Sequence, residues 1–353
     1  MYVHDLDPFL LQISGDFGIR WYGLSYLTGF LMAFFVISWL AQRQRAGLSA
    51  QMVSDFITYG AIGVLVGARL GYCAFYSPDL LIKFKSSFPF WGALAVNEGG
   101  MSSHGGMIGL VIGCILYSRK YGVHMQYLFD LVAVAGPLGI MMGRAANFIN
   151  GELVGRPADP SLPFAVKFPQ DILGWPTYDF AKLASLKDVV SKLGVSSDQW
   201  MQWLDHYQSN REMRDSVYST LVKIVDSIQN GNIEVKNALA DHLIARHPSQ
   251  IYGMLSEGLF VFLVLFLFWS KPRKPGTVGA LFLITYAIAR ISDEYFRMPD
   301  AHIGLDSFGL SRGQWLSVIM FSIGLILFVL WSRSNSLPIQ GWRTDRSVRL
   351  GRR

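Results

Sequence analysis

The residues of this chain best suited to chemistry are ionisable side chains that lie within long apolar segments. They are Arg69, His104, Arg144, Glu257, Arg290 and Glu294. Charged groups inside a bilayer are costly, so they normally face a protein interior or a wet cavity. Three arginines in three different segments are too many to explain by side chains that reach back to the membrane surface. The pattern therefore predicts a polar site within the apolar body of the protein.

Two of these arginines have polar neighbours at helical spacing. Asn147 and Asn150 follow Arg144, and Glu294 lies four residues after Arg290. Arg144 and Asn147 would share one helix face, with Asn150 less well aligned. A planar guanidinium binds two oxygens at once, so an arginine in a low dielectric beside neutral donors suits an anion, above all a phosphate. We therefore expect a phosphate site at Arg144 and Arg290. For Glu257 and Arg69, taken singly, salt bridges between helices are the favoured interpretation over a functional role.

His104 is the one histidine inside an expected membrane span, and two glycines follow it. Glycines allow a ligand or another backbone to approach closely. Histidine is also the natural proton acceptor near neutral pH. A lone histidine is nevertheless often a structural residue. Its sequence surroundings leave a catalytic base and a structural role equally open.

The segments that must position these side chains have the composition of a membrane protein. Hydrophobic residues make up 51% and charged residues only 16% of the 353, whereas soluble domains carry about a quarter charged residues. A helix needs about 20 mostly apolar residues to cross the hydrocarbon core. We expect an all-α integral membrane protein with about seven transmembrane helices. They would lie at 22–41, 56–76, 105–118, 131–150, 251–270, 276–291 and 314–332. The third is short and needs 99–104 to reach full length, so a re-entrant or broken helix is an alternative there.

Lysine and arginine residues follow alternate expected spans, namely the first, third, fifth and seventh. Because cytoplasmic connections are enriched in these residues, the N-terminus is expected outside and the C-terminus in the cytoplasm. Residues 1–150 would then hold the first four transmembrane helices, and 251–332 the last three. Residues 333–353 would form a basic cytoplasmic tail, and 151–250 an extracytoplasmic head.

The expected head has proline-rich turns followed by helical periodicity. Apolar residues spaced by three and four predict one helix over 178–193. Ser197 is placed to cap a second helix, Gly231 lies just beyond a third, and 233–246 repeats the pattern. These helices are amphipathic, so we expect them to pack as a separate helical body.

An ordered series of motifs runs through the chain. The fullest is the ten-residue run Gly-Arg-Ala-Ala-Asn-Phe-Ile-Asn-Gly-Glu at 143–152. Further motifs lie at 21–24, 67–72, 101–106, 163–165, 246–252 and 290–300. One such motif would be weak, but the ordered set is specific. With it, the chain resembles the prolipoprotein diacylglyceryl transferase family over most of its membrane body.

The resemblance implies seven transmembrane helices with the N-terminus outside, in the bacterial inner membrane. It implies transfer of the diacylglyceryl group of phosphatidylglycerol to the lipobox cysteine of a prolipoprotein, which forms a thioether and releases glycerol phosphate. A thiol with a reference pKa of about 8.5 must become a thiolate, and His104 fits a general base. Negative charge grows on the departing phosphate, and Arg144 and Arg290 match arginines that bind the phospholipid.

Position by position, the resemblance implies two sets of site residues. The phospholipid-binding residues would be Arg144, Arg290, Asn147, Tyr22 and Tyr286, and the supporting residues Glu152, Gly155, Glu294, Asn150 and Arg69. The implied partners are phosphatidylglycerol, the prolipoprotein signal peptide and the membrane, with no cofactor, metal or nucleic acid. The chain departs from the family at Gly253, where an acidic residue is often found, and whether Glu257 compensates stays open.

Two other classes of membrane protein would also place charges in their spans. A transporter predicts internal repeats, which the sequence lacks, and it leaves 151–250 unexplained. A scaffold protein would use the charges as pairs between helices. The ordered motifs argue against both interpretations.

Overall fold

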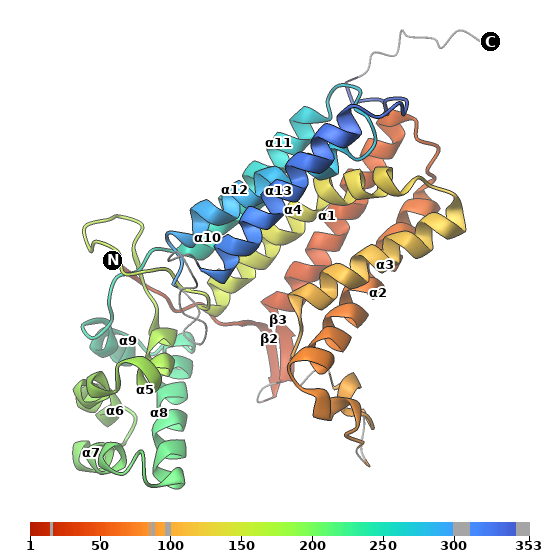
Figure 1. Cartoon of the computed structure of the whole chain (residues 1–353). Coiled ribbons are helices and arrows are strands. Elements are labelled where there is room, and N and C mark those ends of the chain that lie inside the picture. The colour runs from red at the N-terminus through yellow and green to blue at the C-terminus, as the bar shows by residue number, and fades with distance from the viewer. Residues whose placement is uncertain (15–16, 85, 87–88, 96–99, 299–310, 344–353) are drawn as a thin grey trace, which may run out of the picture. The chain divides into compact units, whose positions relative to one another are not determined.

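The computed structural model describes residues 1–353 except 15–16, 85, 87–88, 96–99, 299–310 and 344–353. The chain is mostly helical (Figure 1). It divides into two compact units. The first unit comprises Met1–Tyr26, Met141–Glu257 and Ala289–Ser317, and the second Leu27–Ile140, Gly258–Ile288 and Val318–Arg353.

Long helices lie at every expected span. They are α1 (Trp21–Gln44), α2 (Ala50–Phe75), α3 (Ser103–Tyr121), α4 (Met125–Asn150), α10 (Ser249–Gly253) continued by a π-helical turn (Met254–Phe260) and α11 (Val261–Phe268), α12 (Thr277–Glu294) and α13 (Arg312–Ser332). Five of these stretches, at α1, α2, α4, Ser249–Phe268 and α13, are long and apolar enough to cross a membrane. A mostly helical membrane protein is thus confirmed, and α3 is a continuous helix rather than a broken one.

Helices α2 and α3 pack through glycines in the second unit. Gly63, Gly67 and Gly71 of α2 face Gly105 and Gly109 of α3, and a Cβ atom added at Gly109 would lie 1.9 Å from the Gly63 carbonyl oxygen. Residues without side chains let two helix backbones approach this closely. Figure 1 shows the two helices side by side. The close contact fixes the start of α3.

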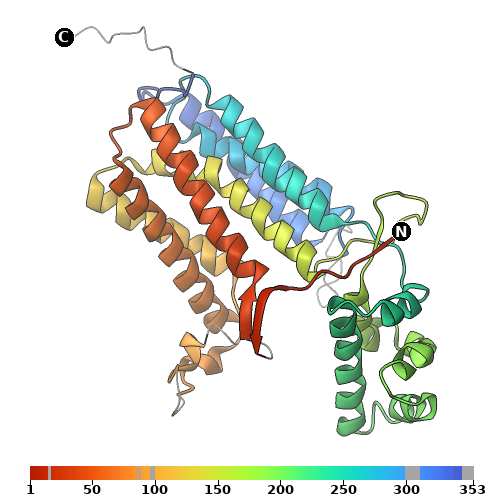
Figure 2. The ribbon, with the colours of Figure 1, turned by 180° about the vertical axis from the view of Figure 1, so that it is seen from behind.

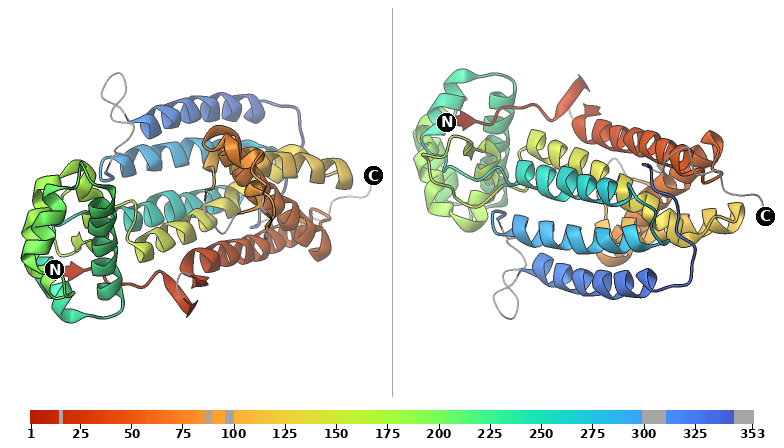
Figure 3. Two further views of the ribbon diagram at one scale, coloured as in Figure 1. Left: turned by 90° about the horizontal axis from the view of Figure 1, so that it is seen from below. Right: turned by 90° about the horizontal axis from the view of Figure 1, so that it is seen from above.

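The start of α12 is fixed by a buried carboxylate of α4 in the same unit. Asp130 accepts hydrogen bonds from the backbone N–H groups of Gly276 and Gly279, both at 2.7 Å. These groups at the first turn of a helix have no partner within the helix, so a carboxylate satisfies them. Farther along, Gly324 of α13 lies against Leu283 and Ile284 of α12, and both views of Figure 3 show α12 and α13 side by side.

The predicted head is a helical body with its own apolar core in the first unit. Its helices are α5 (Trp175–Tyr178), α6 (Lys187–Ser191), α7 (Ser197–Asp205), α8 (Arg211–Gln229) and α9 (Ile233–Ala240). Trp175, Trp200 and Leu221 are fully buried among them. Figure 2 shows α8 as the longest of these helices, in green.

Three sequence expectations within this body were wrong in detail. The single helix over 178–193 is a 3-10 helix (Phe180–Leu186) between α5 and α6. Its apolar residues repeat at intervals of three, and in a 3-10 helix such residues fall on one side. The cap of α7 is Ser196, whose hydroxyl accepts from the Gln199 N–H, and not Ser197. The last helix ends at Ala240.

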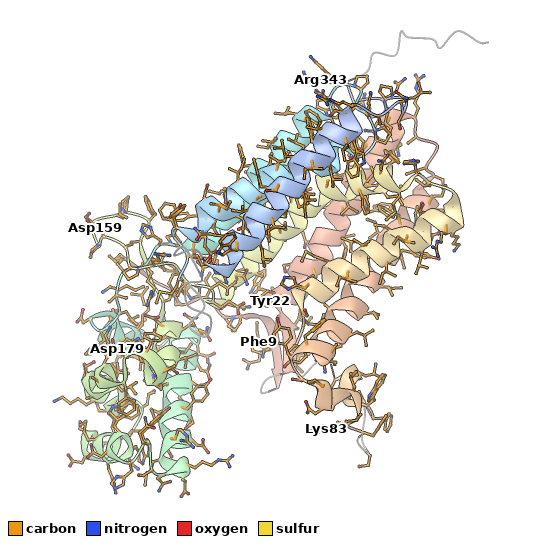
Figure 4. The ribbon with its side chains drawn as sticks, viewed as in Figure 1. Phe9, Tyr22, Lys83, Asp159, Asp179 and Arg343 are labelled. Atoms are coloured by element: carbon orange, nitrogen blue, oxygen red, sulfur yellow. The ribbon has the colours of Figure 1, made fainter. Side chains whose placement is uncertain are left out.

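The described residues also include four short strands that the sequence analysis did not predict. β1 (Tyr2–Val3) pairs in parallel with β4 (Val166–Lys167). β2 (Phe9–Ser14) and β3 (Phe17–Arg20) form an antiparallel hairpin that leads directly into α1. Figure 4 shows Phe9 of this hairpin near Tyr22 in the first turn of α1.

Candidate functional site

A buried ion pair joins α4 to the π-helical turn in the first unit. Arg144 donates from Nη2 and Nε to Oε2 of Glu257, at 2.6 and 3.1 Å. The Glu257 side chain is fully buried, whereas 14% of the Arg144 side chain is exposed. The ion pair expected for Glu257 is therefore confirmed. Glu257 lies in the π-helical turn Met254–Phe260. Turns of this kind are frequent at functional sites.

Arg290 of α12 joins the same carboxylate. Its Nη1 lies 2.7 Å from Oε2 of Glu294, 3.6 Å from Oε1 of Glu257 and 3.7 Å from Oδ2 of Asp293. Glu257 thus lies between the two guanidinium groups, one on each carboxylate oxygen. We call Arg144, Glu257, Arg290, Asp293 and Glu294 the charge cluster. It brings the two predicted phosphate-binding arginines to one buried carboxylate.

The N-terminus of α13 completes the charge cluster. The Ser311 hydroxyl donates to Oε1 of Glu294 at 2.9 Å. Ser311 and Gln314 also exchange side-chain and backbone hydrogen bonds, at 3.0 and 3.2 Å, in the pattern of a capping box. A Cβ atom at Gly313 would lie 3.3 Å from Nη2 of Arg290. A glycine there lets the first turn of α13 approach the guanidinium closely.

A second group of predicted residues lies one helical turn along α4. The Tyr22 hydroxyl donates to Oε1 of Glu152, and Asn147 Nδ2 donates to the Tyr22 hydroxyl. Asn147 and Asn150 also donate to Glu152 Oε1, at 3.2 and 3.5 Å. We call these four residues the polar cluster. Because Asn147 follows Arg144 by three positions, the two clusters share a face of α4.

Main-chain hydrogen bonds connect the segment after α4 to the segments beside α10 and α12. The Arg156 N–H donates to the Phe296 carbonyl at 2.8 Å, and the His247 N–H donates to the Arg156 carbonyl at 3.0 Å. A Cβ atom at Gly155 would lie 2.1 Å from the His247 carbonyl oxygen. Only glycine fits this approach without a backbone shift. These bonds hold together the ends of the elements that carry the charge cluster.

Three predicted residues belong to the second unit. His104 is the second residue of α3, and its side chain is exposed. Ser102, the residue before the start of α3, caps this helix by accepting from the Gly105 N–H at 3.3 Å. Tyr286 lies on α12, where its ring stacks on Phe282 with centroids 5.4 Å apart. The first unit therefore holds both arginines of the predicted site but not the predicted base.

Arg69, also in the second unit, is buried and binds main-chain carbonyl groups. Its guanidinium donates to four main-chain carbonyls, those of Gly92, Ala93, Ala95 and Gly100, at 2.8 to 3.1 Å. It thereby holds the segment that leads into α3. The supporting role expected for Arg69 is consistent with this geometry.

Comparison with known proteins decides the family. The family profile described as prolipoprotein diacylglyceryl transferase matches residues 8–330. The chain belongs to this family. Relatives named phosphatidylglycerol–prolipoprotein diacylglyceryl transferase occur in Bdellovibrio bacteriovorus (60% identical, covering 99% of this chain and 100% of the relative) and Neisseria gonorrhoeae (38%, 92% and 96%). Another occurs in Ralstonia pickettii (36%, 94% and 95%). The resemblance noted in the sequence is confirmed, and membership favours a transferase over a transporter or scaffold.

Asp293 is a member of the charge cluster that the sequence analysis missed. It is buried, with 3% of its surface exposed, and it follows Arg290 by three residues. That spacing is the same signal that identified Asn147 beside Arg144, and it could have identified Asp293. No sequence signal points to Ser311 as the partner of Glu294, because the contact joins the ends of two different helices.

Proposed function

We propose that this protein transfers the diacylglyceryl group of phosphatidylglycerol to the lipobox cysteine of prolipoproteins, the first step of lipoprotein maturation. Membership of the family and the names of its relatives support the reaction. The observation that carries the site assignment is a pair of arginines, Arg144 and Arg290, that share the buried Glu257. Partly exposed guanidinium groups in a low dielectric suit a lipid phosphate.

In the proposed reaction, the cysteine thiolate attacks the glyceryl carbon that bears the phosphate. The carbon–sulfur bond forms as the carbon–oxygen bond breaks, and glycerol phosphate leaves with that oxygen and the bonding electron pair. Arg144 and Arg290 bind the phosphate and stabilise its growing charge. His104 accepts the thiol proton as general base. Tyr22, together with the other members of the polar cluster, orients the head group.

The proposed setting is the bacterial inner membrane. Seven spans would place the N-terminus and the helical body within 151–250 outside the cell, with 1–150 and 251–332 in the membrane. The tail 333–353 would lie in the cytoplasm. The excess of lysine and arginine beside alternate spans supports this orientation. The lipobox peptide and the lipid head group would then meet the enzyme on the outer side.

The deciding experiment measures glycerol phosphate release from phosphatidylglycerol by detergent-purified protein, with a lipobox peptide or the same peptide with its cysteine replaced by alanine. We expect release only with the cysteine peptide. Arg144→Ala should lower the rate by about a hundredfold or more, as loss of a transition-state donor does. Arg211→Ala is the matched control, because Arg211 is 87% exposed on α8. An Arg144→Ala protein as fast as the parent would refute the phosphate role.

The base assignment has its own test. His104→Gln should lower the rate of transfer and change the shape of its pH profile. A His104→Gln variant with the rate and pH profile of the parent would refute a role for His104 as base.

A further inference from the structure

Asp293 reaches a place in the charge cluster that Gly253 leaves open. A Cβ atom added at Gly253 would lie 3.1 Å from Nε of Arg144 and 3.4 Å from Oδ2 of Asp293. The carboxylate of Asp293 therefore extends from α12 to the backbone of α10, on the side where Arg144 lies. Its other neighbour is Arg290, whose Nη1 is 3.7 Å from the same oxygen. Asp293 thus lies beside both arginines.

Asp293 is also the least firmly bound carboxylate of the charge cluster. Glu257 accepts two hydrogen bonds from Arg144, and Glu294 accepts one from Ser311. One oxygen each of Glu257 and Glu294 also lacks a hydrogen bond, but their other oxygen accepts the bonds just named. Oδ1 of Asp293 accepts no hydrogen bond from any residue that the structure describes, and the contact of its Oδ2 with Arg290 is longer than a hydrogen bond. A buried polar atom without a partner costs about 1–3 kcal/mol.

Arg290 shows the complementary feature. Three carboxylate oxygens lie within 4 Å of its Nη1, yet this atom makes no aligned hydrogen bond within the described part of the chain. These carboxylates neutralise the positive charge of Arg290, although the N–H bonds of Nη1 are not aligned with their oxygens. Such a donor can take up a new acceptor without first breaking an aligned hydrogen bond.

Another buried ion pair in the same unit has a different geometry. Arg246 donates from Nη2 to both oxygens of Asp171, each at 2.8 Å, and from Nε to Oδ2 at 3.2 Å. Both side chains are less than a tenth exposed. A carboxylate that serves only to fix an arginine is bound in this manner. Asp293 is equally buried but lacks these bonds.

We propose that Asp293 is a positioning residue that acts as an exchangeable counter-ion of Arg290. Without lipid, Asp293 holds the guanidinium of Arg290 on the side of Arg144. When the lipid phosphate binds, its oxygens take the N–H groups of Arg290 and the weak contact with Asp293 gives way. The role rests on the proposed transfer reaction, and no covalent step involves Asp293.

The test compares Asp293→Asn and Asp293→Glu with the parent in the glycerol phosphate assay. Asparagine is neutral, so it neither competes with the lipid phosphate for Arg290 nor attracts the guanidinium to its position beside Arg144. We expect kcat to fall about tenfold through misplacement of Arg290, while the KM for phosphatidylglycerol falls or stays unchanged. The glutamate is one methylene longer and can bond Arg290 directly. We expect it to compete with the phosphate and raise KM, with kcat near that of the parent.

Asp215→Asn is the control, because Asp215 is an exposed acid on α8 whose side chain is 70% accessible. It should match the parent in kcat, KM and melting temperature. Parent-like kinetics for Asp293→Asn would overturn the inference. So would an Asp293→Asn variant that unfolds or loses stability in proportion to its activity, since that result would make Asp293 structural.

Failure of the proposed function gives a different result. In that case the parent itself releases no glycerol phosphate with the cysteine peptide. Binding of phosphatidylglycerol and phosphatidylcholine in nanodiscs then tests Asp293 alone. We expect Asp293→Glu to bind phosphatidylglycerol more weakly than the parent, and Asp293→Asn to bind it at least as tightly. The reverse order would overturn the counter-ion role.

Discussion

Glu257 is the residue on which both arginines of the charge cluster depend. Replacement with glutamine would leave the guanidinium groups of Arg144 and Arg290 close together without the carboxylate that lies between them. Removing one partner of a buried ion pair typically costs about 3–5 kcal/mol. We expect Glu257→Gln to lower both the melting temperature in detergent and the rate of transfer. Thermal unfolding followed by tryptophan fluorescence measures the first effect.

The control for Glu257→Gln is Glu212→Gln, an exposed acid in the first turn of α8. It should change the melting temperature much less than Glu257→Gln does, because an exposed acid in the first turn of a helix contributes only about 0.3–1 kcal/mol. Equal melting temperatures for Glu257→Gln and the parent would mean that the ion pair does not stabilise the fold.

At the scale of single residues, the sequence predicted what helical spacing can reveal. Arg144 and Asn147 lie three apart on α4, and the structure places both in adjoining clusters. Glu257 was identified as a charge within a span, but its partners could not be, because they come from other helices. Asp293 follows Arg290 by three residues, so the same helical spacing could have identified it, but it was missed.

At the scale of elements, the crossing of α2 and α3 depends on glycine. A Cβ atom at Gly109 would lie 1.9 Å from the Gly63 carbonyl, so alanine must push the two backbones apart. Overpacking of this kind typically costs about 1–3 kcal/mol. We expect Gly109→Ala to lower the melting temperature in detergent and to slow transfer, since α3 carries His104.

Gly136→Ala on α4 is the matched control, because nothing lies within 4 Å of a Cβ atom at that position. Alanine is the better helix former, so this variant should be at least as stable as the parent. A Gly109→Ala protein as stable as Gly136→Ala would show that α2 and α3 tolerate separation.

The sequence predicted long helices well because twenty apolar residues in a row are a strong signal. For example, α4 was expected over 131–150 and spans Met125–Asn150. Prediction from the sequence was wrong for short elements, whose patterns of apolar residues are less distinctive. The apolar period of three in Phe180–Leu186 indicated a 3-10 helix but was taken for an α-helix. The β2–β3 hairpin carries exposed apolar side chains such as Leu11 and Ile13, so it lacks the usual alternation of a half-buried strand.

At the scale of the whole molecule, the first unit is assembled from three separated stretches of sequence. The charge cluster alone draws on α4, the π-helical turn and α12, and α13 closes it through Ser311. Sequence motifs identified several residues of this site. Spacing within a single helix, however, gives no information about contacts between segments that are distant in the sequence. The N-terminal segment is a further example, because nothing in the sequence indicated that His4 would be fully buried against the end of α4.

His4 connects three distant segments and makes the stability of the first unit depend on pH. Its Nε2 donates to the Phe148 carbonyl at 2.7 Å, and its Nδ1 accepts from Gln170 Nε2 at 3.3 Å. The ring also packs against Phe148 and Phe168. Burial lowers the pKa of His4 below its ordinary value of 6.5. The folded protein therefore holds this side chain neutral at a pH where the unfolded chain binds a proton.

The sign of the effect follows from that difference in bound protons. Below about pH 6.5 the unfolded state binds the extra proton, so stability is lost as the pH falls toward the lowered pKa of His4. Protonation would also remove the acceptor for Gln170. We expect the melting temperature of the parent to fall between about pH 7 and about pH 5. His4→Gln should be less stable than the parent near pH 8 and depend less on pH in this interval. Equal slopes for the two proteins would refute the role of His4, because all other ionisable groups are the same in both.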